Sequence, residues 1–320
     1  MLTEKANAIC LLEVLREYSD AEHILPMREI IAKMQSLYGI KIDRRTVYGA
    51  VALLIELGYD ISIYEDNGVG YYLRSRELEQ SEVLLLTDAV YSFPFIPAKQ
   101  TEQLVQKLQK QLSVHQRKRY RYLTISRQDR KTDNRQVFWN IEQLDEAIAQ
   151  KKKVRLGYLH YGLDKKHHEA KTYTLSPYEM VYMNERYYLI CVPDHAPNTR
   201  LYRIDRMKDI QILDDPRSEA VARQEAQNAV YAYVGKPERI VMYCDRAILD
   251  DVIDRFGTAV QIRERDENTF TASFTAPPRG VKFWALQYLP HVEVVEPAWL
   301  REEIIESLGK NKYLALIKEV

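Results

Sequence analysis

A short segment rich in arginine, Arg200-Leu-Tyr-Arg-Ile-Asp-Arg-Met207, carries the clearest chemical signal in this sequence. It places three arginines and one aspartate soon after an almost wholly apolar run at residues 187–192. If the segment is a β-strand, both of its faces carry charge among large apolar side chains. Guanidinium groups are costly to bury unless each meets an anion, and one carboxylate cannot serve three of them. The segment therefore predicts either further acidic partners in the fold or a bound anionic ligand.

The N-terminal residues predict three helices followed by a β-hairpin. Apolar residues at helical spacing indicate helices over residues 4–18, 26–38 and 43–57. Pro26 suits a first helical turn, Gly39 a left-handed C-terminal cap and Asp43 an N-terminal cap. Asn67-Gly68 is a hairpin signal between two β-type segments, at residues 59–64 and 70–74. This order predicts a winged helix-turn-helix domain over residues 1–76.

The start of the third predicted helix is the candidate DNA-reading element, because in this domain type it enters the major groove. It holds Arg44, Arg45, Thr46 and Tyr48, which can contact bases and phosphates. Further phosphate contacts could come from Arg28, Lys33, Lys41, Arg74 and Arg76. The alternative is a solvated helix start. Residues 1–60 contain seven Lys/Arg and nine Asp/Glu, so we expect moderate affinity for double-stranded DNA that requires a homodimer.

Residues 77–150 predict a helical linker and dimerisation region. The stretch 81–112 returns to helical spacing and is interrupted by Phe93-Pro-Phe-Ile-Pro97, which predicts two helices around a proline-rich joint. The basic stretch 117–122 interleaves charge with aromatic residues and suits either nucleic-acid contacts or a solvated linker. A further helix is expected over residues 141–150.

The second half of the chain predicts two modules that contain β-strands. Closely spaced short strands over residues 153–213 indicate a small β-barrel, assigned to residues 151–215. From Pro237 the pattern becomes strand, helix, strand, strand, helix, strand, which predicts a ferredoxin-like α+β module in the C-terminal region, residues 216–320. The predicted fold class is therefore multidomain α+β.

Several classes of function find little support in the sequence. Cys10, Cys191 and Cys244 lie far apart and form no Cys-x-x-Cys pair, which argues against a disulfide framework or structural zinc and fits a cytoplasmic protein. His167-His168-Glu169 is interpreted as an exposed loop rather than a metal site, since consecutive strand side chains face opposite ways. The common catalytic and phosphate-loop motifs are missing, so we expect no enzyme, cofactor or metal. No secretory signal or membrane span is predicted.

Three motifs together resemble one known family. The run Ile42–Tyr48, the apolar Tyr187-Tyr188-Leu189 and the segment Arg200–Met207 resemble WYL-domain transcriptional regulators. Phe283-Trp284 followed by Val292–Pro297 is similar to the WCX-type extension that often follows this domain. One departure is that the name-giving tryptophan is Tyr187 here, which preserves aromatic packing but not a tryptophan-specific contact.

The resemblance implies a helix-turn-helix regulator whose middle domain, an Sm/SH3-like barrel, senses a ligand. The pocket would draw on six residues: Tyr158, His160, Tyr188, Arg200, Arg203 and Arg206. Arginines recognise anions through two parallel hydrogen bonds and tyrosines stack, so a nucleotide, an oligonucleotide or another phosphorylated ligand would fit. The alternative for Arg203 and Arg206 is pairing with Asp205 or with acids elsewhere.

Two functions are consistent with this sequence. The first is a cytoplasmic, homodimeric DNA-binding regulator that responds to an anionic ligand. The second is a non-regulatory accessory protein for RNA or single-stranded DNA, in which the barrel binds nucleic acid and the acidic winged helix contacts protein. Binding of duplex DNA by residues 1–80 and by the full chain would distinguish them.

Overall fold

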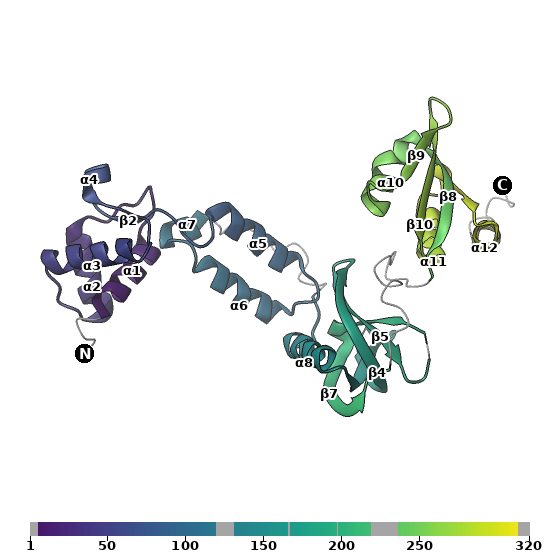
Figure 1. The fold of residues 1–320 in the computed structure, drawn as a ribbon, viewed down its shortest axis with the longest axis horizontal. Coiled ribbons are helices and arrows are strands. Elements are labelled where there is room, and N and C mark those ends of the chain that lie inside the picture. Colours follow the sequence, from purple (N-terminus) through teal and green to yellow (C-terminus); the bar gives the residue numbers. More distant parts are fainter. Residues whose placement is uncertain (1–5, 120–130, 166, 197, 219–235, 313–320) are drawn as a thin grey trace. The chain divides into compact units, whose positions relative to one another are not determined.

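The computed structural model describes residues 6–119, 131–165, 167–196, 198–218 and 236–312. The chain forms two compact units, Met1–Asp133 and Asn134–Val320 (Figure 1). Both mix helices with β-structure, which agrees with the predicted α+β class. Within the described ranges, no helix combines the length and the apolar character needed to cross a bilayer.

The first unit opens with three helices: α1 (Asn7–Tyr18), α2 (Met27–Tyr38) and α3 (Arg44–Glu56). Their boundaries follow the predicted signals. Pro26 precedes α2, Gly39 ends it with φ of 69°, and the Asp43 carboxylate accepts a hydrogen bond of 2.8 Å from the Thr46 amide at the start of α3. The apolar faces enclose one core, which contains Leu11, Leu15, Ile30, Met34, Val47 and Leu54.

The predicted hairpin after α3 has a different form. Strands β1 (Ile61–Ser62) and β2 (Tyr72–Leu73) pair antiparallel, but a short helix, α4 (Tyr64–Asn67), lies between them. The Asn67 amide donates to Ser62 Oγ and to the carbonyls of Ile63 and Gly70, at 2.9–3.0 Å. The two strands therefore pair as the predicted hairpin. The loop between them contains α4, and Gly68 ends this helix at φ of 69°.

Three further helices complete the first unit: α5 (Gln80–Ser92), α6 (Ala98–Gln109) and α7 (Val114–Arg119). Helices α5 and α6 pack together across the predicted proline-rich joint, where Phe95 and Ile96 are buried. The basic stretch 117–122 lies partly outside the described residues, which resume at Lys131.

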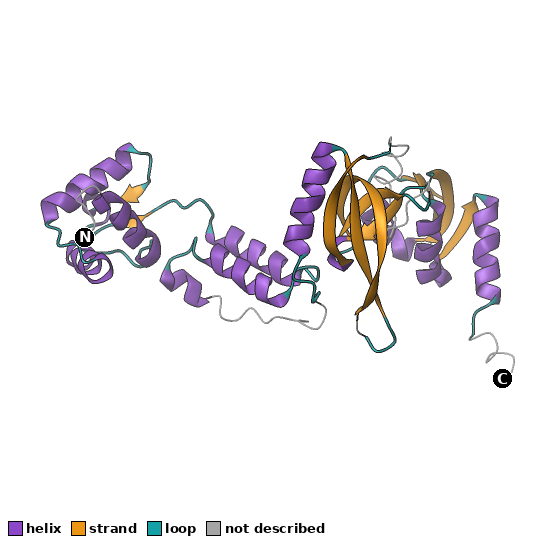
Figure 2. Cartoon of the chain, turned by 90° about the horizontal axis from the view of Figure 1, so that it is seen from below, coloured by secondary structure: helices purple, strands orange, loops and turns teal. Residues whose placement is uncertain are grey.

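The second unit begins with α8 (Val137–Gln150) and a five-stranded antiparallel sheet. The strands are β3 (Lys152–Tyr161), β4 (His167–Met183), β5 (Arg186–Pro193), β6 (Arg200–Arg203) and β7 (Met207–Pro216). The strand order is β6-β5-β4-β3-β7. Helix α8 packs against this sheet through its buried residues Leu144 and Ala147 (Figure 2). The expected barrel does not close, since β6 and β7 are edge strands joined through a 3-10 turn, η4 (Ile204–Arg206). The domain boundary predicted at residue 150 lies between α8 and the sheet that α8 covers, so the two would be assigned to different domains.

The remaining residues of this unit form a second sheet with helices. Strands β8 (Glu238–Asp245), β9 (Gln261–Glu264), β10 (Thr269–Ala276) and β11 (Val292–Glu296) are ordered β11-β8-β10-β9. They are accompanied by α10 (Leu249–Phe256), α11 (Pro278–Gln287) and α12 (Ala298–Gly309). Strands β8–β11 and helices α10 and α11 follow the predicted order. Trp284 is buried in the core, where its ring lies 5.0 Å from that of Phe256.

Candidate ligand site and nucleic-acid interface

The arginine-rich segment surrounds one buried carboxylate. Asp205 is 3% exposed and lies in η4. Arg203 binds it through two parallel hydrogen bonds, Nε to Oδ1 at 3.0 Å and Nη2 to Oδ2 at 2.6 Å. Arg186, at the start of β5, reaches the same Oδ2 at 3.5 Å. The alternative raised for Arg203, pairing with Asp205, is therefore present in the structure.

The sheet register explains why these groups meet. Tyr188 pairs directly with Arg203, so their side chains share one face of the sheet. Arg186 is two residues before Tyr188 on β5 and shares that face. Two guanidinium groups and a tyrosine ring thus gather at the edge of the sheet, beside η4.

Arg206 is the least satisfied of the three arginines in the segment. Its Nε is buried and has no hydrogen-bond partner among the described residues. Its guanidinium carbon lies 5.6 Å from the ring centre of Tyr161, at the end of β3, and Tyr161 in turn stacks on His167 at 4.2 Å. A buried N–H without an acceptor is costly, which makes this group a candidate donor to a ligand.

The electrostatics of the cluster are unbalanced. Burial lowers the pKa of Arg186, and the neighbouring charge of Arg203 lowers it further, against the attraction of Asp205. Burial also opposes the charge of Arg203, but the hydrogen bonds and charge of Asp205 outweigh it, so the pKa of Arg203 is raised. Arg186 and Arg203 share one carboxylate, and Arg206 adds a third guanidinium group from the same 3-10 turn, which leaves a surplus of positive charge in a partly desolvated site.

Two predicted pocket residues on β3 have different surroundings. Tyr158 is 8% exposed, its hydroxyl accepts a hydrogen bond of 3.1 Å from the Arg203 amide, and its ring meets that of Tyr202 at 5.0 Å. Burial raises its pKa. Tyr158 therefore supports the backbone at the site from within the core. His160 is exposed, and its ring lies 5.3 Å from that of Tyr158.

Arg200 does not join the cluster face. It pairs with Cys191 in the register, whereas Arg203 pairs with Tyr188, and the two positions lie on opposite faces of β6. The strand also ends at Arg203, and η4 follows it. The interpretation of residues 200–207 as one alternating strand was therefore wrong, because the 3-10 turn breaks the period of two. Arg200 is exposed at the edge of the sheet.

The sequence reasoning missed Arg186 and Tyr161. Arg186 could have been found from the sequence, because it lies two residues before Tyr188 and alternate residues of a strand share one face. No comparable signal marks Tyr161, because it meets Arg206 only through the pairing of β3 with β7.

The interpretation of residues 167–169 as a loop is wrong, because His167 and His168 begin β4 and pair with β3. His168 Nε2 lies 2.9 Å from Asp164 Oδ1 and is exposed, while His167 packs on Tyr161. In the part of the chain that the structure describes, no three His, Cys, Asp or Glu side chains come together as metal ligands.

The predicted DNA-reading residues lie on the surface of the first unit. Arg28 is near the start of α2, Lys41 precedes α3, and Arg44 and Arg45 open α3; all four are exposed. The structure has no ion pair to any of them within its described ranges. Their charge is therefore available to an external anion.

The two hydroxyl residues of α3 are partly engaged. Thr46 Oγ1 donates to Asp43 Oδ1 at 2.6 Å, so this hydroxyl helps to cap the helix. Tyr48 is 53% exposed and neighbours Tyr71, whose pKa burial raises to about 12 with a further contribution from Tyr48. Both hydroxyls therefore have a neighbour within the unit, Asp43 for Thr46 and Tyr71 for Tyr48.

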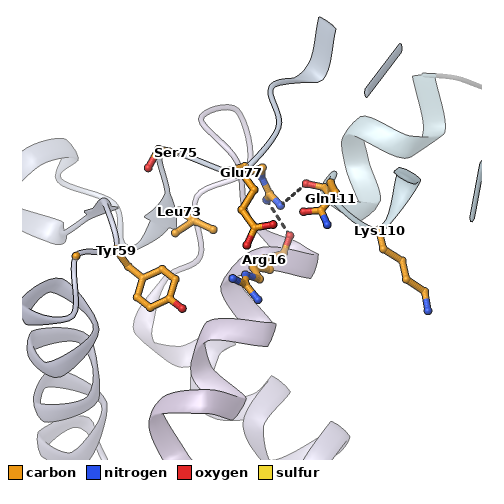
Figure 3. Close-up of a pocket in the computed structure, with 9 residues that line it drawn as sticks. Arg16, Tyr59, Leu73, Ser75, Glu77, Lys110 and Gln111 are labelled. Atoms are coloured by element: carbon orange, nitrogen blue, oxygen red, sulfur yellow. Dashed lines mark hydrogen bonds between the residues drawn. The ribbon is translucent and has the colours of Figure 1, made fainter. Parts of the chain in front are cut away.

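Arg74 and Arg76, expected as extra phosphate contacts, have internal partners instead. Arg74 pairs with Asp66 at 2.5 Å and Asp60 at 3.5 Å. Arg76 donates to the carbonyl oxygens of Arg16 (2.8 Å), Ser19 (2.7 Å) and Gln111 (3.0 Å), in the wall of a cavity of about 270 Å³ (Figure 3). Burial lowers the pKa of Arg76. It joins the end of α1 to the residues after α6, so it serves packing within the unit.

Two segments of the second unit match known domain families. Residues 140–212 match the family model of the WYL domain, and residues 236–310 match that of the WCX domain. The chain therefore contains a WYL domain followed by a WCX domain. Arg186, Arg203, Asp205 and Arg206 all lie within the WYL match, which also includes most of α8.

Several solved structures are similar to the chain at low sequence identity. Proteasome accessory factor B/C (PafBC) of Arthrobacter aurescens is 14% identical over 94% of this chain, with a TM-score of 0.27. The chain spans 47% of that protein, about half its length. A CRISPR Cas-related protein is also 14% identical, over 99% of this chain and 85% of its own, with a TM-score of 0.35. None of the curated proteins compared with the chain matches it.

Proposed function

We propose that this protein is a homodimeric, cytoplasmic transcriptional regulator that binds double-stranded DNA through its N-terminal helices and an anionic ligand through its WYL domain. The ligand is a nucleotide, an oligonucleotide or a single-stranded nucleic acid. The function requires no catalysis, cofactor or metal. Three buried free cysteines are consistent with a reducing cytoplasm.

The observation that carries the proposal is the surplus of guanidinium groups around η4. Asp205 already neutralises Arg203. Among the described residues, Arg206 Nε is buried without a hydrogen-bond partner, and Arg186 reaches Asp205 only at 3.5 Å. A phosphate group could accept hydrogen bonds from these guanidinium groups, which bind phosphate through charge-assisted hydrogen bonds. The rings of Tyr161 and Tyr188 lie in the same region and offer surfaces on which a base can stack.

The exposed cations at the start of α3 support the DNA-binding part of the proposal. If α3 acts as a recognition helix, Arg44 and Arg45 at its start would contact the major groove, and Arg28 and Lys41 would contact the phosphate backbone. Because residues 1–60 carry nine acids against seven bases, one copy should bind duplex DNA only moderately. Two copies on one site would double the phosphate contacts.

The test uses full-length protein and duplex fragments that it selects from genomic DNA at low salt. Duplex affinity is measured with and without a short 5′-phosphorylated oligothymidylate. We expect Arg206→Met to bind this probe about tenfold more weakly or worse, because a charge-assisted hydrogen bond contributes about 1.5–3 kcal/mol. Arg200→Met, on the opposite face of β6, is the matched control. If Arg206→Met binds the probe and responds as the wild type does, the site assignment fails.

A second candidate function is an accessory protein for RNA or single-stranded DNA. The excess of acidic residues in the N-terminal helices favours it, since that region would then contact protein rather than duplex DNA. It would be preferred if neither residues 1–80 nor the full chain binds duplex at low salt while the full chain retains single strands.

A further inference from the structure

The η4 turn is held in place by amide side chains from the residues that open the second unit. Asn134 Nδ2 donates to the carbonyl oxygens of Asp205 at 3.0 Å and Met207 at 2.6 Å. Asn140 Nδ2 donates to those of Ile204 at 3.3 Å and Met207 at 2.8 Å. A single 3-10 turn leaves most of its carbonyl groups without internal partners, so these two amides supply the donors that the turn lacks.

An asparagine at the buried position 140 is unexpected unless its N–H donors stabilise the η4 turn. Its side chain is fully buried, and its Oδ1 has no hydrogen-bond partner among the described residues. A buried oxygen without a donor costs stability, so an apolar residue of similar volume would pack better. The amide contributes two N–H groups, which donate to the carbonyl oxygens of Ile204 in η4 and of Met207, the residue that follows the turn.

The same turn faces the candidate ligand site with its side chains. Asp205 pairs with Arg203 and Arg186, and the buried Nε of Arg206 has no hydrogen-bond partner in the part of the chain that the structure describes. Residues 204–207 are therefore bonded through their backbone to the segment 134–140 and through their side chains to the arginine cluster. A ligand could displace the Arg206 side chain or compete with Asp205 for a guanidinium group. Either change would shift the backbone of residues 204–207, to which Asn134 and Asn140 are hydrogen-bonded.

Asn134 also occupies a special place in the chain. The first compact unit ends at Asp133, and Asn134 is the first residue of the second unit. Whatever the relative placement of the units, the peptide bond between these residues is part of the covalent path from the WYL domain to the DNA-binding helices. A change in the hydrogen bonds of Asn134 therefore acts directly at the junction.

We propose that η4 is the coupling element of this regulator and that Asn134 and Asn140 are positioning residues that transmit anion binding to the interunit junction. This inference rests on the proposed function and adds its route of regulation. A ligand changes DNA affinity only if it favours one of two arrangements of the protein, and those arrangements differ in the contacts between residues 134–140 and η4. The coupling is reciprocal, so bound duplex should alter probe affinity by the same factor.

The test compares Asn134→Ala with Gln136→Ala in full-length protein. Gln136 is the matched control, because it lies in the same segment and has the same amide group but exchanges hydrogen bonds with Asp209, beyond the turn. The probe is the short 5′-phosphorylated oligothymidylate, and the readouts are its affinity and the change that it causes in duplex affinity. In the wild type we expect a change of about fivefold or more. Asn134→Ala should bind the probe as the wild type does but lose most of that change, and Gln136→Ala should keep it.

Asn134→Ser, which retains one donor, should give an intermediate response, and hydrogen exchange should separate binding from transmission. Probe binding should alter exchange at residues 204–207 in every variant, but at residues 135–140 only where Asn134 is intact. If the probe changes the duplex affinity of Asn134→Ala as much as that of the wild type, the coupling role is overturned but the proposed function is not. The same holds if Asn134→Ala loses probe binding, because Asn134 would then belong to the ligand site itself. Failure of the wild type to bind probe or duplex overturns the proposed function as well.

Discussion

Removing the carboxylate at position 205 should destabilise the sheet of the WYL domain substantially. Asp205 is 3% exposed, and the side chains of Arg186 and Arg203 are 20% and 22% exposed. Deleting one partner of a buried ion pair typically costs about 3–5 kcal/mol, because a charge is left uncompensated. The two guanidinium groups retain some contact with water, so we expect about 2–3 kcal/mol for Asp205→Ala.

The assay is hydrogen exchange of the β5 and β6 amides as a function of urea, which is uncharged and leaves the electrostatics intact. With a urea dependence of about 2 kcal/mol per molar, the loss corresponds to a midpoint lower by about 1–1.5 M. Asp214→Ala is the control, since this aspartate is exposed on β7 and should leave the midpoint unchanged. Added phosphate should restore the variant more than it stabilises the wild type, because it replaces the missing anion.

Two results would refute this reasoning. A midpoint shift below about 0.5 M would mean that the guanidinium groups are solvated well enough to need no partner. An equal effect of phosphate on variant and wild type would mean that the vacated position does not attract anions. Either result would also remove the electrostatic basis of the ligand site.

Four other predictions concern the first unit. Arg76→Met removes three part-buried hydrogen bonds to carbonyl groups and should lower the free energy of unfolding by about 2–3 kcal/mol in chemical denaturation. Gly70→Ala brings a Cβ to 2.1 Å from the Leu25 carbonyl oxygen and should cost about 1–3 kcal/mol in the same assay, with no loss if the loop moves freely. Arg44→Ala should reduce the slope of log affinity against log salt for duplex DNA by about 1, and an unchanged slope would exclude a phosphate contact. Burial and the neighbouring His23 lower the pKa of His115 below 6.5. As the pH falls, His115 therefore takes up a proton in the unfolded state before it does so in the folded state. Thermal stability should fall as the pH drops below 6.5, and it should fall less in His115→Phe.

Helix boundaries in the first unit were predictable because they depend on local chemistry. Pro26, Gly39 and Asp43 act through their own backbone angles and short-range hydrogen bonds, which the sequence reveals directly. The loop at Asn67 was not predictable in the same way. Its side chain bonds three loop acceptors at once, and this alternative outweighs the tight turn that Asn-Gly usually favours.

The candidate ligand site was only partly predictable, for a reason of topology. Arg203 and Asp205 are near neighbours in sequence, so their pairing could be considered from the segment itself. Arg186 and Tyr161 reach the site through strand pairing, which depends on register and not on sequence distance. The separation of Arg200 from Arg203 was hidden because η4 interrupts the strand, and no pattern of apolar residues marks where that turn begins.

The buried Asp205 means that the WYL domain carries its own counterion. An incoming anion does not enter an empty positive pocket, because it competes with a carboxylate that already occupies one edge of Arg203. On the proposed function, we expect ligands with several charges to be favoured, because they can leave the Arg203–Asp205 pair intact and bind Arg186 and Arg206 together.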